Sequence, residues 1–389
     1  MNHGVYTSQQ ATSVAVPASV ASGIPFIVGT AKYSDAPAAT RATVNVPLIA
    51  TTWDEAEAAL GYSDSDWNKY TLYEAMYAYF KLFGVGPVIF CPVGEDATAD
   101  TAQAAVIAGI EQIELCGNMF GLVPDLILAP GFAGVAAVQA VMMTKAAAIN
   151  DKYQARAVLD IEAATYSAAI TAKTSGSFNE RGILAFGHPK SGDFAFHGST
   201  YLAARIAQTD GDNEGIPYES PSNKYVPMDS LVNNSGTALL LSETQANLLN
   251  AQGIVTFINV GGQFVAWGNY TAAYPTSSDV AEIFIPVARM FDYVRKVITQ
   301  TFRDKVDDPL DTRLHDTIND SVNIWLNGLV GSGYLMGGRC EYIADENPTT
   351  SLMGGTIKFH VYITPPGPAQ EIDFVVEYDV SYLEAAFSE

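Results

Sequence analysis

Residues 253–329 constrain the fold most, because two strand patterns are followed there by two long helical patterns. The run Gly-Ile-Val-Thr-Phe-Ile-Asn-Val at 253–260 is apolar and rich in β-branched residues, which predicts a buried strand. Residues 264–267 predict the second strand of a hairpin. Apolar residues then recur at helical spacing over 287–302, after Pro286, and again over 310–329. This order predicts a mixed architecture of helices and strands.

The first of these helices carries basic side chains at a regular interval. Arg289, Lys296 and Arg303 are seven residues apart, so a continuous helix places them along one face. Such a face is either the solvated side of an amphipathic helix or a docking stripe for an acidic partner. The spacing alone leaves both interpretations open.

Composition excludes two classes of protein. The chain has 389 residues, enough for two or three domains, and a formal net charge of −22. A nucleic-acid-binding protein is expected to be basic, so we predict no nucleic-acid partner and no docking to anionic membrane surfaces. Closely packed copies of so acidic a chain would repel one another over about 8 Å at physiological salt. No apolar run reaches the roughly 18–20 residues of a membrane span, so we predict no direct membrane insertion.

The N-terminus and the cysteines indicate where the chain folds. The first residues contain no basic region followed by an apolar one, so they predict no secretion signal. The three cysteines are far apart and fit neither a zinc pattern nor a redox pair. We therefore expect reduced, buried thiols and folding in a cytoplasm.

The predicted fold class combines α/β and α+β parts. Ala-rich helices alternate with apolar strands over 96–250, which predicts a central α/β insert domain with a mostly parallel sheet. Residues 23–95 together with 251–370 are expected to form a discontinuous inner α+β assembly domain. Residues 1–22 are expected to form an N-terminal arm, and residues 371–389 a C-terminal strand or arm.

The two arms are the main functional indication. Val5 and Tyr6 begin one predicted strand, and Phe374, Val376 and Tyr378 alternate along the other, over 371–380. A terminal strand without a partner in its own chain can pair with the sheet edge of a neighbouring copy. Copies that both donate and accept a strand make head-to-tail contacts, which close into rings or continue as helical filaments.

Catalytic and cofactor motifs are weak. The chain has no P-loop and no Gly-x-Ser-x-Gly elbow, and the glycine-rich loop at 331–337 follows a helix, whereas a dinucleotide loop must follow a strand. None of the five histidines has the spacing of a metal site. His188 and His197 enclose Asp193, which is compatible with a loop metal or catalytic site but is more typical of a polar surface loop. We predict no catalytic, cofactor-binding or metal-binding residue.

Eight stretches, in conserved order along the whole chain, together resemble the contractile tail sheath family of bacteriophages, R-type bacteriocins and related injection systems. They are His-Gly-Val-Tyr at 3–6, Gly-Ile-Pro-Phe-Ile-Val-Gly at 23–29, Ala-Pro-Gly at 129–131, Ala-Arg-Ala-Val-Leu-Asp at 155–160, Ser-Pro-Ser-Asn-Lys at 220–224, Gly-Ile-Val-Thr-Phe-Ile-Asn at 253–259, Trp-Gly-Asn-Tyr-Thr at 267–271 and Gly-Gly at 337–338. The start of the helix at Arg289 and Met290 also matches, and the length suits sheaths without extra outer domains.

The resemblance implies a structural machine and no cofactor. Subunits would stack as rings around an inner tail tube protein, and both arms would lend strands to neighbouring subunits. Baseplate and tail terminator proteins would be further partners. Contraction, without nucleotide, would drive the tube through a target cell envelope. The sheath would assemble in a bacterial cytoplasm and then belong to a released phage tail or bacteriocin particle. Within this picture, Arg289, Lys296 and Arg303 are expected to face the tube.

Two alternatives remain open. A soluble α/β enzyme would place its site at the carboxyl ends of the central strands, near residues 130–131 or 188–197. Such an enzyme is expected to form a small closed oligomer and to gain thermal stability with a ligand. A non-contractile shell or surface-layer protein would also polymerise, but it would have no tube partner.

Overall fold

A large, mostly parallel sheet forms the centre of the molecule. The computed structural model describes residues 22–95 and 99–387, so the predicted strand at Val5 and Tyr6 lies outside the described residues. Eight strands follow the order β11-β10-β6-β5-β4-β1-β3-β2. Their bounds are β1 Pro25–Gly29, β2 Leu48–Ala50, β3 Val88–Pro92, β4 Leu126–Leu128, β5 Arg156–Ile161, β6 Gly182–Phe186, β10 Ile254–Val260 and β11 Gln263–Trp267. The pairings from β3 through to β10 are parallel, whereas β2 and β11 run antiparallel at the two edges.

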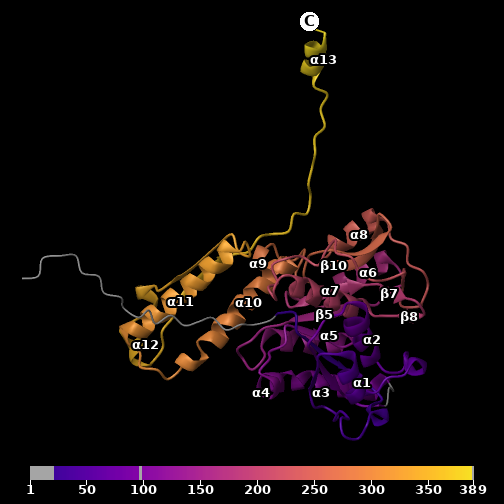
Figure 1. Cartoon of the computed structure of the whole chain (residues 1–389), viewed down its shortest axis with the longest axis horizontal. Coiled ribbons are helices and arrows are strands. Elements are labelled where there is room, and N and C mark those ends of the chain that lie inside the picture. Colours follow the sequence, from indigo (N-terminus) through magenta and orange to yellow (C-terminus); the bar gives the residue numbers. More distant parts are fainter. Residues whose placement is uncertain (1–21, 96–98, 388–389) are drawn as a thin grey trace, which may run out of the picture.

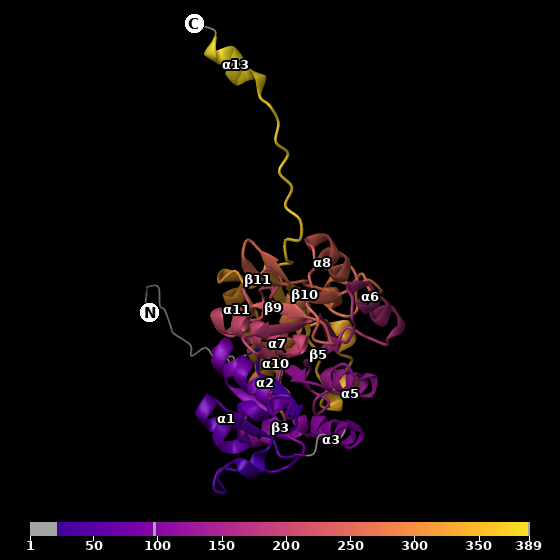
Figure 2. The same cartoon turned by 90° about the vertical axis from the view of Figure 1, so that its right-hand side faces the viewer.

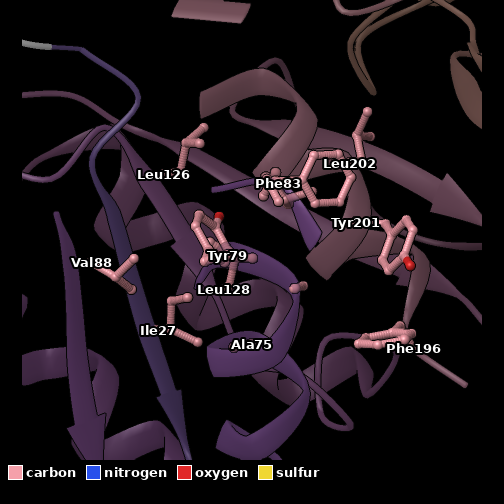
Figure 3. Close-up of a cluster of buried hydrophobic side chains, with 14 of the residues drawn as sticks. Ile27, Ala75, Tyr79, Phe83, Val88, Leu126, Leu128, Phe196, Tyr201 and Leu202 are labelled. Atoms are coloured by element: carbon pink, nitrogen blue, oxygen red, sulfur yellow. The ribbon is translucent and has the colours of Figure 1, made fainter. Parts of the chain in front are cut away.

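Helices cover both faces of this sheet, as its apolar strands require. One face packs against α1 Trp53–Leu60, α2 Leu72–Met76 and α7 Gly198–Asp212. The other face packs against α3 Ala99–Glu111, α5 Ala136–Ala147, α6 Tyr166–Ser175 and α8 Glu243–Asn250. Figure 3 shows the first of these two cores, in which Ile27 and Leu128 of the sheet lie near Tyr79 and Tyr201 of the helical layer.

Several local predictions are confirmed where the sequence signals were strongest. The hairpin at 253–267 forms β10 and β11, paired antiparallel. Helix α1 follows Thr52, a residue type that favours the N-cap position, and the Thr52 hydroxyl accepts a hydrogen bond from the N–H of Glu55 at 3.3 Å. Pro286 lies in the first turn of α10 Ile285–Thr301. These signals depend only on residues close together in sequence, so they do not require knowledge of the tertiary fold.

A smaller unit follows the sheet. Helices α10 and α11 Thr312–Gly331 pack with the antiparallel strands β12 Gly337–Glu341 and β13 His360–Thr364 around a separate apolar core. The short helix α12 Thr349–Met353 lies between the two strands in sequence. Figure 1 shows α10 leading from the sheet towards α11 and α12, which lie to one side of the larger body.

Two further short helices and a small antiparallel sheet also form in the chain. They are α4 Cys116–Phe120, α9 Val280–Ile283, and the three-stranded sheet of β7 His188–Ser191, β8 Phe194–Ala195 and β9 Ser230–Val232. None of the helices within the described residues is long and apolar enough to cross a bilayer.

The C-terminal segment runs away from both units. Residues 371–379 are extended and pair with no strand of the described chain, and α13 Val380–Ala386 follows them. Figures 1 and 2 both show this segment leaving the body, with α13 far from every other element. The predicted strand over 371–380 therefore forms no ladder within this subunit, and its last residue already belongs to a helix.

The main sheet does not divide at residues 96 and 250, where the sequence placed domain boundaries. Strand β1 of the predicted inner domain pairs with β4 of the predicted insert, and β6 of the insert pairs with β10. The change in composition near residue 96 reflects Ala-rich crossover helices of one sheet. The structural division instead separates the sheet body from the smaller unit that begins with α10.

Candidate functional site

Arg289 and Lys296, two of the three basic residues expected along one helix face, do share a face of α10, but that face is turned inward. Arg289 is 4% exposed and Lys296 is 3% exposed. Nη1 of Arg289 donates to Oδ1 of Asp210 at 2.8 Å, and Nη2 donates to Oδ2 of the same carboxylate. Nζ of Lys296 donates to Oδ1 of Asp125 at 2.9 Å and to the carbonyl of Val123 at 2.8 Å. Both charges are therefore satisfied within the chain.

The prediction of an exposed, tube-facing stripe is wrong for Arg289 and Lys296. The seven-residue spacing correctly gives them a common face, but spacing does not say which face is buried. Arg303 lies beyond the end of α10, in the turn Arg303–Lys305, and its side chain is exposed. A tube contact by Arg303 stays a prediction.

A third acidic group completes the contact between α10 and the sheet. Oδ2 of Asp292 accepts a hydrogen bond from Nε of Arg156 at 2.6 Å, and Oδ1 accepts one from Nη1 of Arg181 at 3.0 Å. Arg156 also donates to the carbonyl of Ala288 at 3.0 Å. The sheet residues involved lie at or just before the amino ends of β4, β5 and β6. Helix α10 thus crosses that end of the sheet on paired charges.

The predicted C-terminal arm residues are exposed. Phe374, Val376 and Tyr378 are more than three-quarters exposed, and Ile372 is 71% exposed. The acidic residues Asp373 and Glu377 lie between these apolar positions. The arm starts from a fixed point at Gln370. Nε2 of Gln370 donates a hydrogen bond to Oδ1 of Asn269 at 2.8 Å, and Oε1 of Gln370 accepts one from the Tyr270 hydroxyl at 2.7 Å. Exposed apolar side chains at alternate positions of an extended segment are typical of a surface that pairs with another chain.

The two-stranded sheet offers a matching edge. The side chain of Asn323, on α11, bonds to both the N–H and the carbonyl of Cys340, at 2.8 and 3.0 Å, so it covers part of the outer edge of β12. No strand within the described residues pairs with the outer edge of β13. A two-stranded sheet presents unpaired backbone groups along its outer edges, and an edge of this kind can accept an added strand.

A polar cluster lies at the opposite, carboxyl end of the main sheet. His188 directly follows β6 and Gly187, Glu162 directly follows β5, and His197 precedes α7. Nε2 of His188 lies 3.0 Å from Oε2 of Glu162, and Nδ1 of His197 lies 2.8 Å from Oε2 of Glu74 on α2. This is where the sequence placed the site of the alternative enzyme, although Asp193 is exposed and takes no part in the cluster.

Burial and charge shift the proton affinities in this cluster. Burial raises the pKa of Asp160 to about 6, although the His197 charge and the Ser199 hydroxyl favour its ionised form. Burial acts to lower the pKa of His197, but the Glu74 carboxylate, with help from Asp160 and Glu162, raises this pKa to about 10. The cluster therefore holds an excess of negative charge that His197 partly balances.

Sequence reasoning missed charged residues that complete the ion pairs beneath α10 and the polar cluster around His188 and His197. Asp125 and Arg156 stand immediately before or at the start of apolar strands, and Glu162 immediately follows one. Because like ends of neighbouring parallel strands meet at one edge, charged residues at these positions were a usable signal. Glu74 carried no such signal, because it lies within a helix whose packing the sequence does not reveal.

Relatives identify the chain. No family model matches it. It is 27% identical over 401 aligned positions to a putative prophage major tail sheath protein of Pseudomonas aeruginosa (strain UCBPP-PA14), with 98% of this chain and 97% of that protein covered. It is 26% identical over 294 residues to the tail sheath protein of Burkholderia phage BcepMu, covering 72% of this chain but only 60% of that protein's length. The chain is thus similar, over nearly its whole length, to tail sheath proteins of phages and prophages.

Solved structures show the same fold for the sheath chain. A chain of the PVC sheath complex, an extracellular contractile injection system in its contracted state, superposes with a TM-score of 0.73 at 15% identity, covering 98% of this chain and 99% of that one. A chain of the anti-feeding prophage helical sheath, also contracted, gives 0.69 at 18% identity, covering 97% and 99%. The similarity in sequence and the shared fold together support the sheath subunit over the soluble enzyme.

The buried ion pairs of α10 lead to a stability prediction. Replacing Asp210 by Ala leaves Arg289 buried and unpaired, so we expect the free energy of unfolding to fall by about 3–5 kcal/mol. The matched control is Asp212→Ala, two residues along the same helix, because Asp212 is 71% exposed and pairs with Arg205 at 3.4 Å. That control should lose less than about 1 kcal/mol.

Urea unfolding of the monomeric chain measures both variants. A double variant, Asp210→Leu with Arg289→Met, should recover much of the loss, since it leaves no buried charge. Equal losses for Asp210→Ala and Asp212→Ala would show that the pair does not fix α10 to the sheet.

Proposed function

We propose that the chain is the structural subunit of a contractile sheath: copies polymerise helically around an inner tube, and contraction drives that tube through a target cell envelope. The observation that carries this proposal is the combination, in one subunit, of an unpaired apolar arm and an unpaired strand edge. A subunit that can both donate and accept a strand can be linked into an open assembly. We infer a mechanical role without a catalytic step.

The arm and the edge are compatible in pattern. Residues 372, 374, 376 and 378 are apolar. The three residues between them are Asp373, Val375 and Glu377, so two are acidic and one is apolar. Val361 and Ile363 of β13 pack on the core of the smaller unit. Added to the free edge of β13, the arm would turn one apolar face towards that same core and leave its acidic positions in solvent.

Magnitudes indicate that a single arm contact is weak. Burying each large apolar side chain contributes about 1.5–3 kcal/mol. Ordering the backbone costs about 1–2 kcal/mol per residue, so over residues 371–379 this cost is as large as that gain or larger. A sheath held by such contacts gains its strength from many arms acting together, because each added contact is then effectively intramolecular.

Paired charges support rigid-body movement of each subunit. Arg289, Lys296 and Asp292 hold α10 on the sheet, and the smaller unit continues from α10. The arm departs instead from the sheet body at Gln370, after the segment 365–368 with its three prolines. Subunits could therefore exchange globular contacts during contraction while the arms keep them connected.

Partners and location follow from this role. The inner tail tube protein would contact the inner surface of the sheath, and baseplate and tail terminator proteins would contact its two ends. Assembly would take place in a bacterial cytoplasm, before the sheath becomes part of a phage tail or bacteriocin particle. The N-terminal arm at 1–22, with Val5 and Tyr6, would provide the second linking strand.

The arm predicts a face-specific effect on polymerisation. Val376→Asp places a charge on the face that would enter the neighbour's core, so we expect the critical concentration for tube formation to rise at least tenfold. A loss of about 1.4 kcal/mol per contact suffices for that change. Sedimentation and negative-stain microscopy measure it.

Val375→Asp is the matched control, since Val375 is 77% exposed and one position along the strand turns a side chain to the other face. We expect it to change the critical concentration far less. Deleting residues after Gln370 should abolish tubes while keeping the unfolding free energy within about 0.5 kcal/mol, because residues 371–379 are exposed and pair with no strand among the described residues of their own subunit. Equal effects of the two valine variants, or tubes from the truncated chain, would refute strand donation by this arm.

Arg303 predicts an effect on the tube contact alone. If its exposed guanidinium meets an acidic tube surface, as the proposed contact requires, Arg303→Glu should reduce sheath assembly on co-expressed tubes at least tenfold through like-charge repulsion. Self-assembly without tubes should be unchanged.

Lys69→Glu provides the control for net charge, because Lys69 is an exposed residue on the segment leading into α2. Arg289 and Lys296 are left unchanged in this test, because a glutamate at either buried position would destabilise the body. Normal assembly of the Arg303→Glu chain on tubes, counted by electron microscopy, would remove Arg303 from the interface.

A further inference from the structure

We infer that Glu162, His188 and His197 form a binding site for a divalent transition metal ion, with Zn²⁺ as the ion that best fits the donor set. One donor atom from each residue lies within 4.8 Å of the donors of the other two. Two imidazole nitrogens and one carboxylate oxygen are a ligand set that zinc uses, with a fourth position left for water. The inference does not depend on the sheath function.

The fold brings these three residues together from separate elements. Glu162 follows β5, His188 begins β7 just after β6, and His197 leads into α7. Strands β5 and β6 are parallel neighbours, so their carboxyl ends meet at one edge of the sheet. This end of an open α/β sheet is the usual position for a ligand.

Glu74 orients His197 as a metal ligand requires. Its buried carboxylate lies 2.8 Å from Nδ1 of His197 and accepts a second bond, at 2.7 Å, from the Thr200 hydroxyl. A carboxylate on Nδ1 fixes the ring and directs Nε2 away from it, which is the arrangement found behind many zinc-binding histidines. The surface pair of His360 and Glu346, 2.9 Å apart, has neither this support nor a third ligand among the described residues.

The three donor atoms must move slightly closer together to coordinate an ion. Zinc bonds of about 2.0–2.1 Å place tetrahedral donors roughly 3.4 Å apart, so the widest separation must shorten by about 1.4 Å. Glu162 and His188 are partly exposed and can turn towards His197. Gly134 leaves room for Glu162, since a β-carbon at Gly134 would lie 2.6 Å from Cγ of Glu162.

Charge also favours a cation here. Glu74, Asp160 and Glu162 surround the two histidines, and Asp160 is buried and bonded to the N–H and the hydroxyl of Ser199 at 2.7 and 2.6 Å. A bound cation would balance the charge of these carboxylates.

The test uses the full chain, stripped of metal by a chelator and kept below its polymerising concentration. Isothermal titration with Zn²⁺ should give one site per chain with a dissociation constant of about 1 µM or tighter. Co²⁺ should produce the visible absorption of a four- or five-coordinate site. Saturating Zn²⁺ should raise Tm, because the ion binds the folded chain preferentially.

Variants locate the site. His188→Ala and Glu162→Gln should each weaken Zn²⁺ binding at least tenfold, and Glu74→Gln should weaken it about 10- to 100-fold through the orientation of His197. His360→Ala, which removes a histidine from the unsupported pair, should bind like the unaltered chain. Circular dichroism of each metal-free variant confirms that it is folded.

Two results would overturn the inference. One is no saturable Zn²⁺ or Co²⁺ binding by the unaltered chain. The other is binding that survives intact in folded His188→Ala and Glu162→Gln chains, which would place the ion elsewhere. Neither result would affect the sheath function, which polymerisation tests separately.

Discussion

Buried ion pairs beneath α10 determine how the two units of this protein are joined. A charge taken out of water is costly unless a partner of opposite sign meets it in good geometry. Here Arg289 meets Asp210 and Lys296 meets Asp125, while Asp292 receives both Arg156 and Arg181. Such pairs add little net stability over an apolar contact, but they tolerate few alternative arrangements. They fix the position of α10, and with it the position of the smaller unit.

This attachment separates what is rigid from what can connect subunits. The sheet body and the smaller unit each have a core of their own, and α10 contributes Ile285 to the first and Met290, Val294 and Val297 to the second. The arm after Gln370 has no core to join and exposes its apolar side chains. A sheath needs both properties, since subunits must keep their shape while their mutual contacts change. The net charge of −22 adds a repulsion between copies, so salt should favour close packing.

The sequence predicted the elements well and their exposure poorly. Local patterns found β10, β11, α1 and α10, because capping residues and apolar periodicity act within a few residues. The same patterns could not tell that the face bearing Arg289 and Lys296 is buried, since its partners, Asp210 and Asp125, are distant in the chain. The predicted boundaries at 96 and 250 failed for the same reason. Composition changes along the chain, but the pairing of β1 with β4 and of β6 with β10 is not local.

The polar cluster at the carboxyl end of the sheet also depends on contacts between residues that are remote in sequence. The sequence raised His188 and His197 as a pair and then preferred a polar surface loop, because Glu162 and Glu74 are remote in sequence. Strand order brings all four residues together. Residues that flank predicted neighbouring strands are therefore better candidates for a shared site than residues that are close along the chain.

The central claim is that the arm of one subunit completes the sheet of another, and a cryo-EM reconstruction of tubes grown from the purified chain tests it most directly. The account predicts hollow helical tubes in which residues 371–379 run along β13 of a neighbouring subunit. Phe374, Val376 and Tyr378 should then be buried against that neighbour. Tubes in which this segment stays in solvent or folds back on its own subunit would contradict the account.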